Sequence, residues 1–212
     1  MAAYIHIVNN KMTVKEQIVE AARERFLHYG YGKTTMAEVA SDCCMSPGNL
    51  YRYFPGKLDI AEEIARRDSS VLERRLRALV NQPSCSALVK LKNFLVELLE
   101  FTYGRVENDP RLAEMFWQII RERPKMAQEV LAMEQGLMAQ ILSAGNASGE
   151  LAVEDVAHTS AMISAATQRF RYPQIRNPAP LEQLKQELCG VFELLAFGMV
   201  TPATREACRI AS

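Results

Sequence analysis

The sequence predicts an all-α protein of about nine helices, with a three-helix N-terminal head followed by a helical body. Apolar residues recur at helical spacing along most of the 212 residues, and no segment shows the alternation of period two that marks a strand. Caps and breakers also divide the chain at short intervals. With 49% hydrophobic and 24% charged residues, the chain has the composition of a globular protein that buries a sizeable core.

The first predicted helix begins at Thr13. Thr13 is a favourable N-cap, and Glu16 three residues later completes a capping box. An apolar stripe at helical spacing follows and reaches Phe26. Gly30 and Gly32 then provide the stop, because glycine is common just past the end of a helix.

Two short helices and one long helix are predicted next. Thr35 can cap the second helix and Ser46 the third, in which Pro47 takes the first helical position. Pro55 and Gly56 end the third helix. A longer helix then starts near Lys57 and ends at Asn81-Gln82-Pro83.

The body contains five further candidate helices. They span residues 84–104, 110–121, 124–144, 154–171 and 181–200. Residues 145–149 read as a loop, and residues 172–180 contain three prolines, so they cannot continue a helix. We place the boundary inside the long helix, which predicts a head over residues 1–60 and a body over residues 61–212.

Charge and cysteine content narrow the class of protein. The formal net charge is zero, which does not by itself suggest a nucleic-acid binder. The five cysteines are odd in number and scattered, so they indicate neither a disulfide framework nor a zinc site, and free thiols are typical of a reducing cytosol. Residues 1–12 lack the features of a signal peptide, and no apolar stretch could span a bilayer. We therefore expect a cytoplasmic protein.

Residues 36–55 have the spacing of a helix-turn-helix. Ala40 is the small residue where two helices would cross, and Cys43, Met45 and Leu50 would lock the second helix onto the first. This arrangement leaves the start of the second helix exposed, over Pro47-Gly48-Asn49. In a helix-turn-helix such positions approach base edges in the major groove of DNA.

The segment TTMAEVASDCCMSPGNLYRYFPGKLDI, residues 34–60, resembles the N-terminal region of tetracycline-repressor-like (TetR-like) regulators. Their pattern includes Ser-x-Gly-x-Leu-Tyr-x-Tyr-Phe-x-x-Lys after a turn. The matching residues are Thr34, Thr35, Val39, Ala40, Ser46, Gly48, Leu50, Tyr51, Tyr53, Phe54 and Lys57. With the preceding helix, the resemblance covers roughly residues 13–65.

The resemblance implies a DNA-binding site on this head. Pro47, Gly48 and Asn49 would face bases, while Tyr51, Tyr53, Lys57 and one of Thr34 or Thr35 would bind phosphates; phosphate contacts set the register and base contacts the sequence. Arg52 would contact a phosphate or a guanine. The implied set is Thr34, Thr35, Ser46, Pro47, Gly48, Asn49, Tyr51, Arg52, Tyr53 and Lys57.

Two residues depart from the family pattern. Cys44 stands in the turn where the family usually has glycine, so the turn is either strained or of a different geometry. Pro47 stands where many relatives have lysine, which removes a charge that could reach a phosphate. The adjacent Cys43 and Cys44 leave a sensor of oxidation open as an alternative to simple packing.

TetR-like proteins commonly bind a small molecule within the body, and aromatic and methionine side chains would suit such a pocket. The candidate ligand residues are Phe94, Phe101, Tyr103, Phe116, Trp117, Arg121, Met162 and Gln168. Small and apolar stripes on the last two helices predict the interface of a homodimer. These interface residues are Ala157, Ala161, Ala165, Leu184, Leu188, Val191, Phe192 and Leu195.

The function that follows is a sequence-specific DNA-binding regulator, expected to be a repressor that a small-molecule inducer releases from its operator. The alternative is a ligand-independent regulator or an architectural DNA-binding protein. We expect no enzyme, because the sequence shows no nucleophile–base arrangement and no glycine-rich phosphate loop. Neither a cofactor, a metal nor a membrane partner is expected. The identity of the inducer, the operator and the regulated genes stays open, as does the choice between repression and activation.

Overall fold

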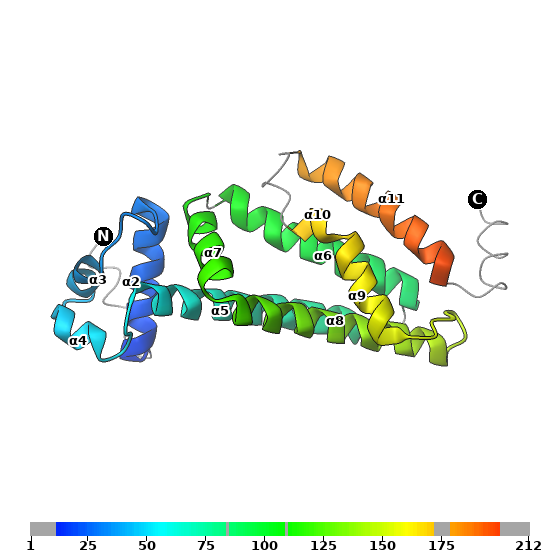
Figure 1. The fold of residues 1–212 in the computed structure, drawn as a ribbon, viewed down its shortest axis with the longest axis horizontal. Coiled ribbons are helices and arrows are strands. Elements are labelled where there is room, and N and C mark those ends of the chain that lie inside the picture. The colour runs from blue at the N-terminus through cyan, green and yellow to red at the C-terminus, as the bar shows by residue number, and fades with distance from the viewer. Residues whose placement is uncertain (1–11, 84, 109, 172–178, 200–212) are drawn as a thin grey trace. The chain divides into compact units, whose positions relative to one another are not determined.

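The structure is a computed structural model that describes residues 12–83, 85–108, 110–171 and 179–199. Over these residues the chain is all-helical, as the sequence predicts, and its ten helices are labelled α2 to α11 (Figure 1). The prediction of about nine helices is close. The difference comes from one predicted helix that the structure divides in two.

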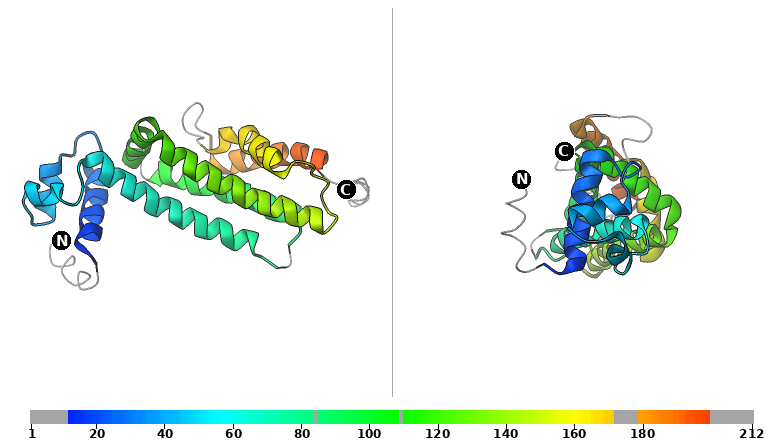
Figure 2. Two further views of the ribbon diagram at one scale, coloured as in Figure 1. Left: turned by 60° about the horizontal axis from the view of Figure 1, so that its bottom comes forward. Right: turned by 90° about the vertical axis from the view of Figure 1, so that its left-hand side faces the viewer.

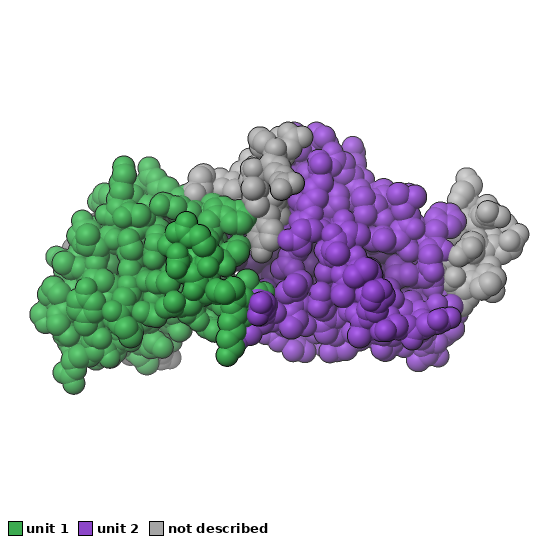
Figure 3. All heavy atoms as spheres, in the orientation of Figure 1, with its two compact units in different colours: residues 1–69, 107–127 green, residues 70–106, 128–212 purple. Residues whose placement is uncertain are grey.

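The chain folds as two compact units (Figure 3). Unit 1 comprises residues 1–69 and 107–127, and unit 2 comprises residues 70–106 and 128–212. Residues 107–127 therefore pack with the N-terminal part of the chain, although the sequence places them in the body. The predicted boundary between head and body, placed between residues 60 and 61 inside the long helix, stays a prediction.

Unit 1 contains four helices and part of a fifth. These are α2 (Val14–Tyr29), α3 (Met36–Asp42), α4 (Pro47–Tyr51), the first half of α5 (Lys57–Val80) and α7 (Pro110–Glu122). Their core is apolar and fully closed, with Ile18, Phe26, Leu50 and Ile60 at 0% exposure. This core fixes α3 and α4 against α2 and α5.

Local signals start each of the first three helices where the sequence predicts. The hydroxyl of Thr13 accepts a hydrogen bond from the Glu16 amide at 3.2 Å, and the Glu16 carboxylate accepts from the Thr13 amide at 2.7 Å. Thr35 and Glu38 form the same box on α3. Ser46 caps α4, with Pro47 at its first position. Gly30 ends α2 at a φ of +87°, which glycine adopts without strain.

Unit 2 is a helical bundle. It contains the second half of α5, α6 (Ala87–Asn108), α8 (Pro124–Ala147), α9 (Val156–Ala166), α10 (Gln168–Arg171) and α11 (Leu181–Met199). The left view of Figure 2 shows α9, α10 and α11 together along one side of the bundle. Leu91, Phe94, Leu99 and Leu142 are fully buried between the helices.

Two boundaries in unit 2 differ from the prediction. The helix predicted over 154–171 breaks at Thr167, whose hydroxyl at 2.7 Å and amide at 3.0 Å both donate to the Ile163 carbonyl. Such side-chain bonds to the carbonyl four residues earlier often bend helices. The loop predicted over 145–149 is helical as far as Ala147. Position 145 of α8 has no room for a side chain, because a Cβ there would meet Ala87 and Leu151.

Candidate nucleic-acid interface

The turn between α3 and α4 has the hydrogen bonds of a Schellman motif. The amide of Met45 donates to the Ala40 carbonyl at 2.9 Å, and the amide of Cys44 donates to the Ser41 carbonyl at 3.0 Å. Cys44 takes the left-handed position at a φ of +53°, which glycine occupies in most such motifs. The turn thus keeps the ordinary helix-turn-helix geometry, and the strain falls on Cys44.

The predicted packing residues do lock α4 onto α3. Ala40 and Leu50 are 0% exposed, and the half-buried Cys43 and Met45 pack against the same core. The Ser46 hydroxyl accepts from the Asn49 amide at 3.2 Å. Consequently α4 stands at a fixed angle with one face outward.

That outward face carries the residues that the resemblance assigns to DNA. Pro47 and Gly48 are exposed and Asn49 is half-buried. Tyr51 and Tyr53 are 52% and 40% exposed, although a core role would have buried at least one of them. Arg52 between them is also exposed. The structure therefore gathers two phenolic hydroxyls and one guanidinium at the end of α4.

The two threonines occupy different environments. Thr34 is 2% exposed and its hydroxyl donates to the Gly30 carbonyl at 3.0 Å. Thr35 is exposed, but its hydroxyl donates to the Glu38 carboxylate at 2.8 Å within the capping box. Of these two threonines, only Thr35 is exposed enough to contact a phosphate. Its hydroxyl would first have to give up the hydrogen bond to Glu38.

Lys57, the first residue of α5, lies partly inside unit 1. Its ammonium donates to the carbonyls of Tyr31 at 2.6 Å and Thr34 at 2.8 Å, with the Gly32 carbonyl at 3.5 Å. Desolvation lowers the pKa of Lys57. The resemblance assigns a phosphate contact to Lys57. In the structure, its ammonium already binds the loop between α2 and α3.

Comparison with protein families matches two regions of the chain. Residues 18–64 match the family described as "Bacterial regulatory proteins, tetR family", and residues 87–192 match "Tetracyclin repressor-like, C-terminal domain". Together these regions cover more than half of the chain, including both helices of the helix-turn-helix. The chain belongs to the tetR family of bacterial regulatory proteins. It is a DNA-binding transcriptional regulator.

Solved structures show the same fold over nearly the whole chain. A transcriptional regulator from Cytophaga hutchinsonii is 22% identical with a TM-score of 0.66, over 87% of this chain and 97% of that one. Thermus thermophilus FadR, in complex with lauroyl-CoA, is 23% identical with a TM-score of 0.65, over 88% and 95%. Bacillus subtilis FadR, in complex with stearoyl-CoA, is 22% identical with a TM-score of 0.63, over 85% and 96%. The comparison with curated proteins finds no match.

The predicted ligand residues of this tetR-family regulator fall in both units. Phe94 is fully buried in unit 2, where Phe101 and Tyr103 pack against the core. Phe116, Trp117 and Arg121 belong to α7 in unit 1, and Arg121 is exposed and paired with Glu122. Met162 and Gln168 are exposed on unit 2. The predicted ligand residues therefore do not surround one common interior space. Phe94, Phe101 and Tyr103 are the members of the set that belong to or pack against the core of unit 2.

The predicted dimer residues divide between interior and surface. Leu184, Leu188 and Phe192 of α11 are buried within the chain's own core, and Val191 and Leu195 are half-buried. On α9, Ala157 and Ala165 are exposed and Ala161 is half-buried. Leu194 at 77% and Phe197 at 54% exposure are outward apolar residues that the sequence reasoning did not single out, and Met162, predicted as a ligand residue, is 48% exposed.

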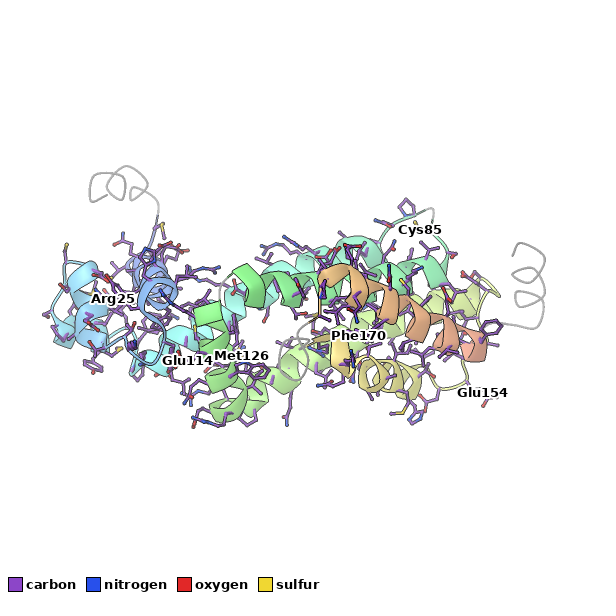
Figure 4. The ribbon with its side chains drawn as sticks, turned by 90° about the horizontal axis from the view of Figure 1, so that it is seen from above. Arg25, Cys85, Glu114, Met126, Glu154 and Phe170 are labelled. Carbon is purple, nitrogen blue, oxygen red and sulfur yellow. The ribbon has the colours of Figure 1, made fainter. Side chains whose placement is uncertain are left out.

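Charged residues around the head were also missed, because their partners are distant in sequence. Arg25 of α2, labelled in Figure 4, forms an ion pair with Asp42 of α3 at 2.5 Å. Arg123 reaches Asp59 and Glu62 of α5, each at 3.0 Å. Arg111 donates to the His28 carbonyl, at the end of α2. These contacts brace the helices behind α4 and leave its outer face clear.

The cysteines of the turn differ in exposure. Cys44 is exposed, whereas burial raises the pKa of the Cys43 thiol to about 11. Cys43 therefore stays a neutral thiol at neutral pH, as a packing residue would. Over the described part of the chain, no three His, Cys, Asp or Glu side chains come together as a metal site. None of the described helices is both long and apolar enough to cross a membrane.

Proposed function

We propose that this regulator is a cytoplasmic repressor that binds a pseudo-palindromic operator as a homodimer and leaves it when a small molecule binds unit 2. The observation that carries the DNA contacts is the outer face of α4, with Tyr51, Arg52 and Tyr53 exposed beside the capped first turn. Pro47, Gly48 and Asn49 would approach base edges there. The tyrosine hydroxyls and Arg52 would hold the phosphates on either side.

The homodimer would use α9 and α11. These helices present the exposed Met162 and Leu194 together with small residues such as Ala165 and Gly190. Large exposed apolar side chains grouped on neighbouring helices support an interface, because water disfavours them. Two heads are also what an operator with half-sites one helical turn apart requires.

The effector would be a molecule with a large apolar part. Two proteins of the same fold are solved with lauroyl-CoA and stearoyl-CoA, and the interior of unit 2 around Phe94, Phe101 and Tyr103 is aromatic and apolar. By linkage, effector and operator must weaken each other's binding by the same factor. A regulator that needs no effector is the alternative, and it predicts operator affinity that no ligand changes.

The test measures binding to the duplex that the wild-type protein selects from a random pool. Tyr51→Phe and Tyr53→Phe each remove one hydroxyl and should weaken binding about tenfold, since a hydrogen bond to a charged group contributes about 1.5–3 kcal/mol. Tyr29→Phe is the matched control, because Tyr29 is a 58% exposed tyrosine of α2 outside the proposed interface. Full affinity in both α4 variants would refute the interface. Weaker operator binding in the presence of lauroyl-CoA, used as the probe, would then support the effector-controlled repressor over the ligand-independent alternative.

A further inference from the structure

One side chain joins the start of α5 to the loop between α2 and α3. A lysine ammonium carries three donors, and three loop carbonyls, those of Tyr31, Gly32 and Thr34, lie within 3.5 Å of Lys57 Nζ. The same nitrogen lies 4.3 Å from the centre of the Tyr31 ring. The donor capacity of Lys57 is therefore used up by the protein itself.

The loop that Lys57 holds is also supported by the Thr34 hydroxyl, which donates to the Gly30 carbonyl at 3.0 Å. Tyr31 is 8% exposed and packs edge-on against Phe26, with ring centres 5.2 Å apart. Thr34 is buried beneath the loop. If Lys57 turned outward to a phosphate, the Tyr31 carbonyl would keep only the Thr34 amide at 3.3 Å, and the Thr34 carbonyl would lose the ammonium that binds it at 2.8 Å. Losing a partner in a largely buried place is unfavourable. A direct phosphate contact by Lys57 would thus work against the loop that precedes α3.

The same loop carries a second lysine, in the opposite situation. Lys33 lies between Gly32 and Thr34, is exposed, and its ammonium forms no ion pair with any residue in the described ranges. Resting on the DNA-binding function, we propose that Lys33 makes the phosphate contact and that Lys57 is a positioning residue that holds the loop of Lys33 and the N-cap of α3 in place.

The salt dependence of DNA binding separates the two roles. Each phosphate that a lysine neutralises adds about 0.9 to the slope of log affinity against log salt. On the duplex selected by the wild type, Lys33→Gln should lower the slope by about 0.9 for each Lys33 contact. Lys57→Met should weaken binding with the slope unchanged. Lys125→Gln, at an exposed lysine of α8, is the matched control and should change neither quantity.

A slope that falls for Lys57→Met and stays for Lys33→Gln would overturn the proposal. Because Lys57→Met could loosen the head as a whole, amide hydrogen exchange gives a second reading without DNA. We expect faster exchange at the Thr34 and Thr35 amides, with the middle of α2 still protected; unchanged exchange there would refute the positioning role. If the wild type selects no duplex, the proposed DNA function and the Lys33 contact are both refuted. Amide hydrogen exchange then tests the positioning role of Lys57 by itself.

Discussion

Arg171 and Glu134 form a two-point ion pair inside unit 2. Arg171 Nη1 lies 2.6 Å from one carboxylate oxygen of Glu134, and Nη2 lies 2.8 Å from the other. Glu134 is 1% exposed, and burial raises its pKa to about 7 even though Arg171 acts in the opposite direction. The pair ties the short helix α10 to the middle of α8, at a carboxyl group that titrates near neutral pH.

The pair makes the stability of the protein depend on pH in a definite direction. The folded-state pKa of Glu134 lies above its ordinary value of 4.5, so the folded state binds the proton more tightly than the unfolded state. The resulting stability is full below that ordinary value and is lost as pH rises through about 7. Glu134→Gln is neutral at every pH and should lack this loss. The free energy of unfolding of wild type relative to Glu134→Gln should therefore fall by up to about 3 kcal/mol from acid to mildly alkaline pH. Urea unfolding over a pH series measures it, and a difference that is constant with pH would contradict the prediction.

Cys44 offers a test of backbone strain in the helix-turn-helix. Its φ of +53° is unfavourable for any side chain with a Cβ, so Cys44→Gly should raise the free energy of unfolding by about 1 kcal/mol. Cys44→Ala removes the thiol and keeps the strain, so it should leave stability near that of the wild type. Denaturant midpoints of the three proteins decide the matter. Equal stability of the glycine and alanine variants would assign any effect to the thiol.

The sequence predicts those elements whose signals are local. Thr13, Thr35 and Ser46 each cap a helix through a residue three positions later, so their helices begin where predicted. The start of α6 is different: the Glu150 carboxylate accepts from the amides of Ala87 at 2.7 Å and Leu88 at 3.0 Å, from more than sixty residues away. The Glu150 contact has no local signal. The local part of this helix start is the Ser86 hydroxyl, which accepts from the Val89 amide at 3.3 Å, and the predicted start at residue 84 lies three residues early.

The candidate site divides in the same way. The spacing of Tyr51 and Tyr53 predicts that at least one of them is exposed, since residues two apart on a helix cannot share one buried face. The structure exposes both, and Tyr53 lies just past the end of α4. The environment of Lys57 depends on carbonyls between 23 and 26 residues earlier in the chain, and a motif records only that a lysine is present. The ligand and dimer residues depend on packing between helices, which explains why Leu184 and Phe192 lie inside and Leu194 outside.

The exposed face of α11 predicts the behaviour of a surface variant. Leu194 is 77% exposed, so Leu194→Glu should not disturb the folded protomer, but it would place a charge in the proposed dimer interface. We expect the dimer to dissociate at concentrations where the wild type is dimeric, as seen by analytical ultracentrifugation. Val89→Glu likewise replaces an exposed apolar residue with a charged one, at a 46% exposed position of α6 outside the proposed interface, and should leave the dimer intact. An unchanged dimer in Leu194→Glu would remove this face from the interface.

Two glycines of α8 should respond in opposite directions to the same substitution. A Cβ on Gly145 would lie 2.5 Å from Leu151 Cδ1 and 2.7 Å from the Ala87 Cβ, which cannot rotate away. Gly145→Ala should therefore cost at least about 1 kcal/mol of stability, because overpacking outweighs the better helix propensity of alanine. A Cβ on Gly136 meets nothing within 4 Å, so Gly136→Ala should gain up to about 1 kcal/mol. Thermal unfolding of both variants checks the pair. If Gly145→Ala is as stable as Gly136→Ala, the close approach of α8 to Ala87 does not require glycine.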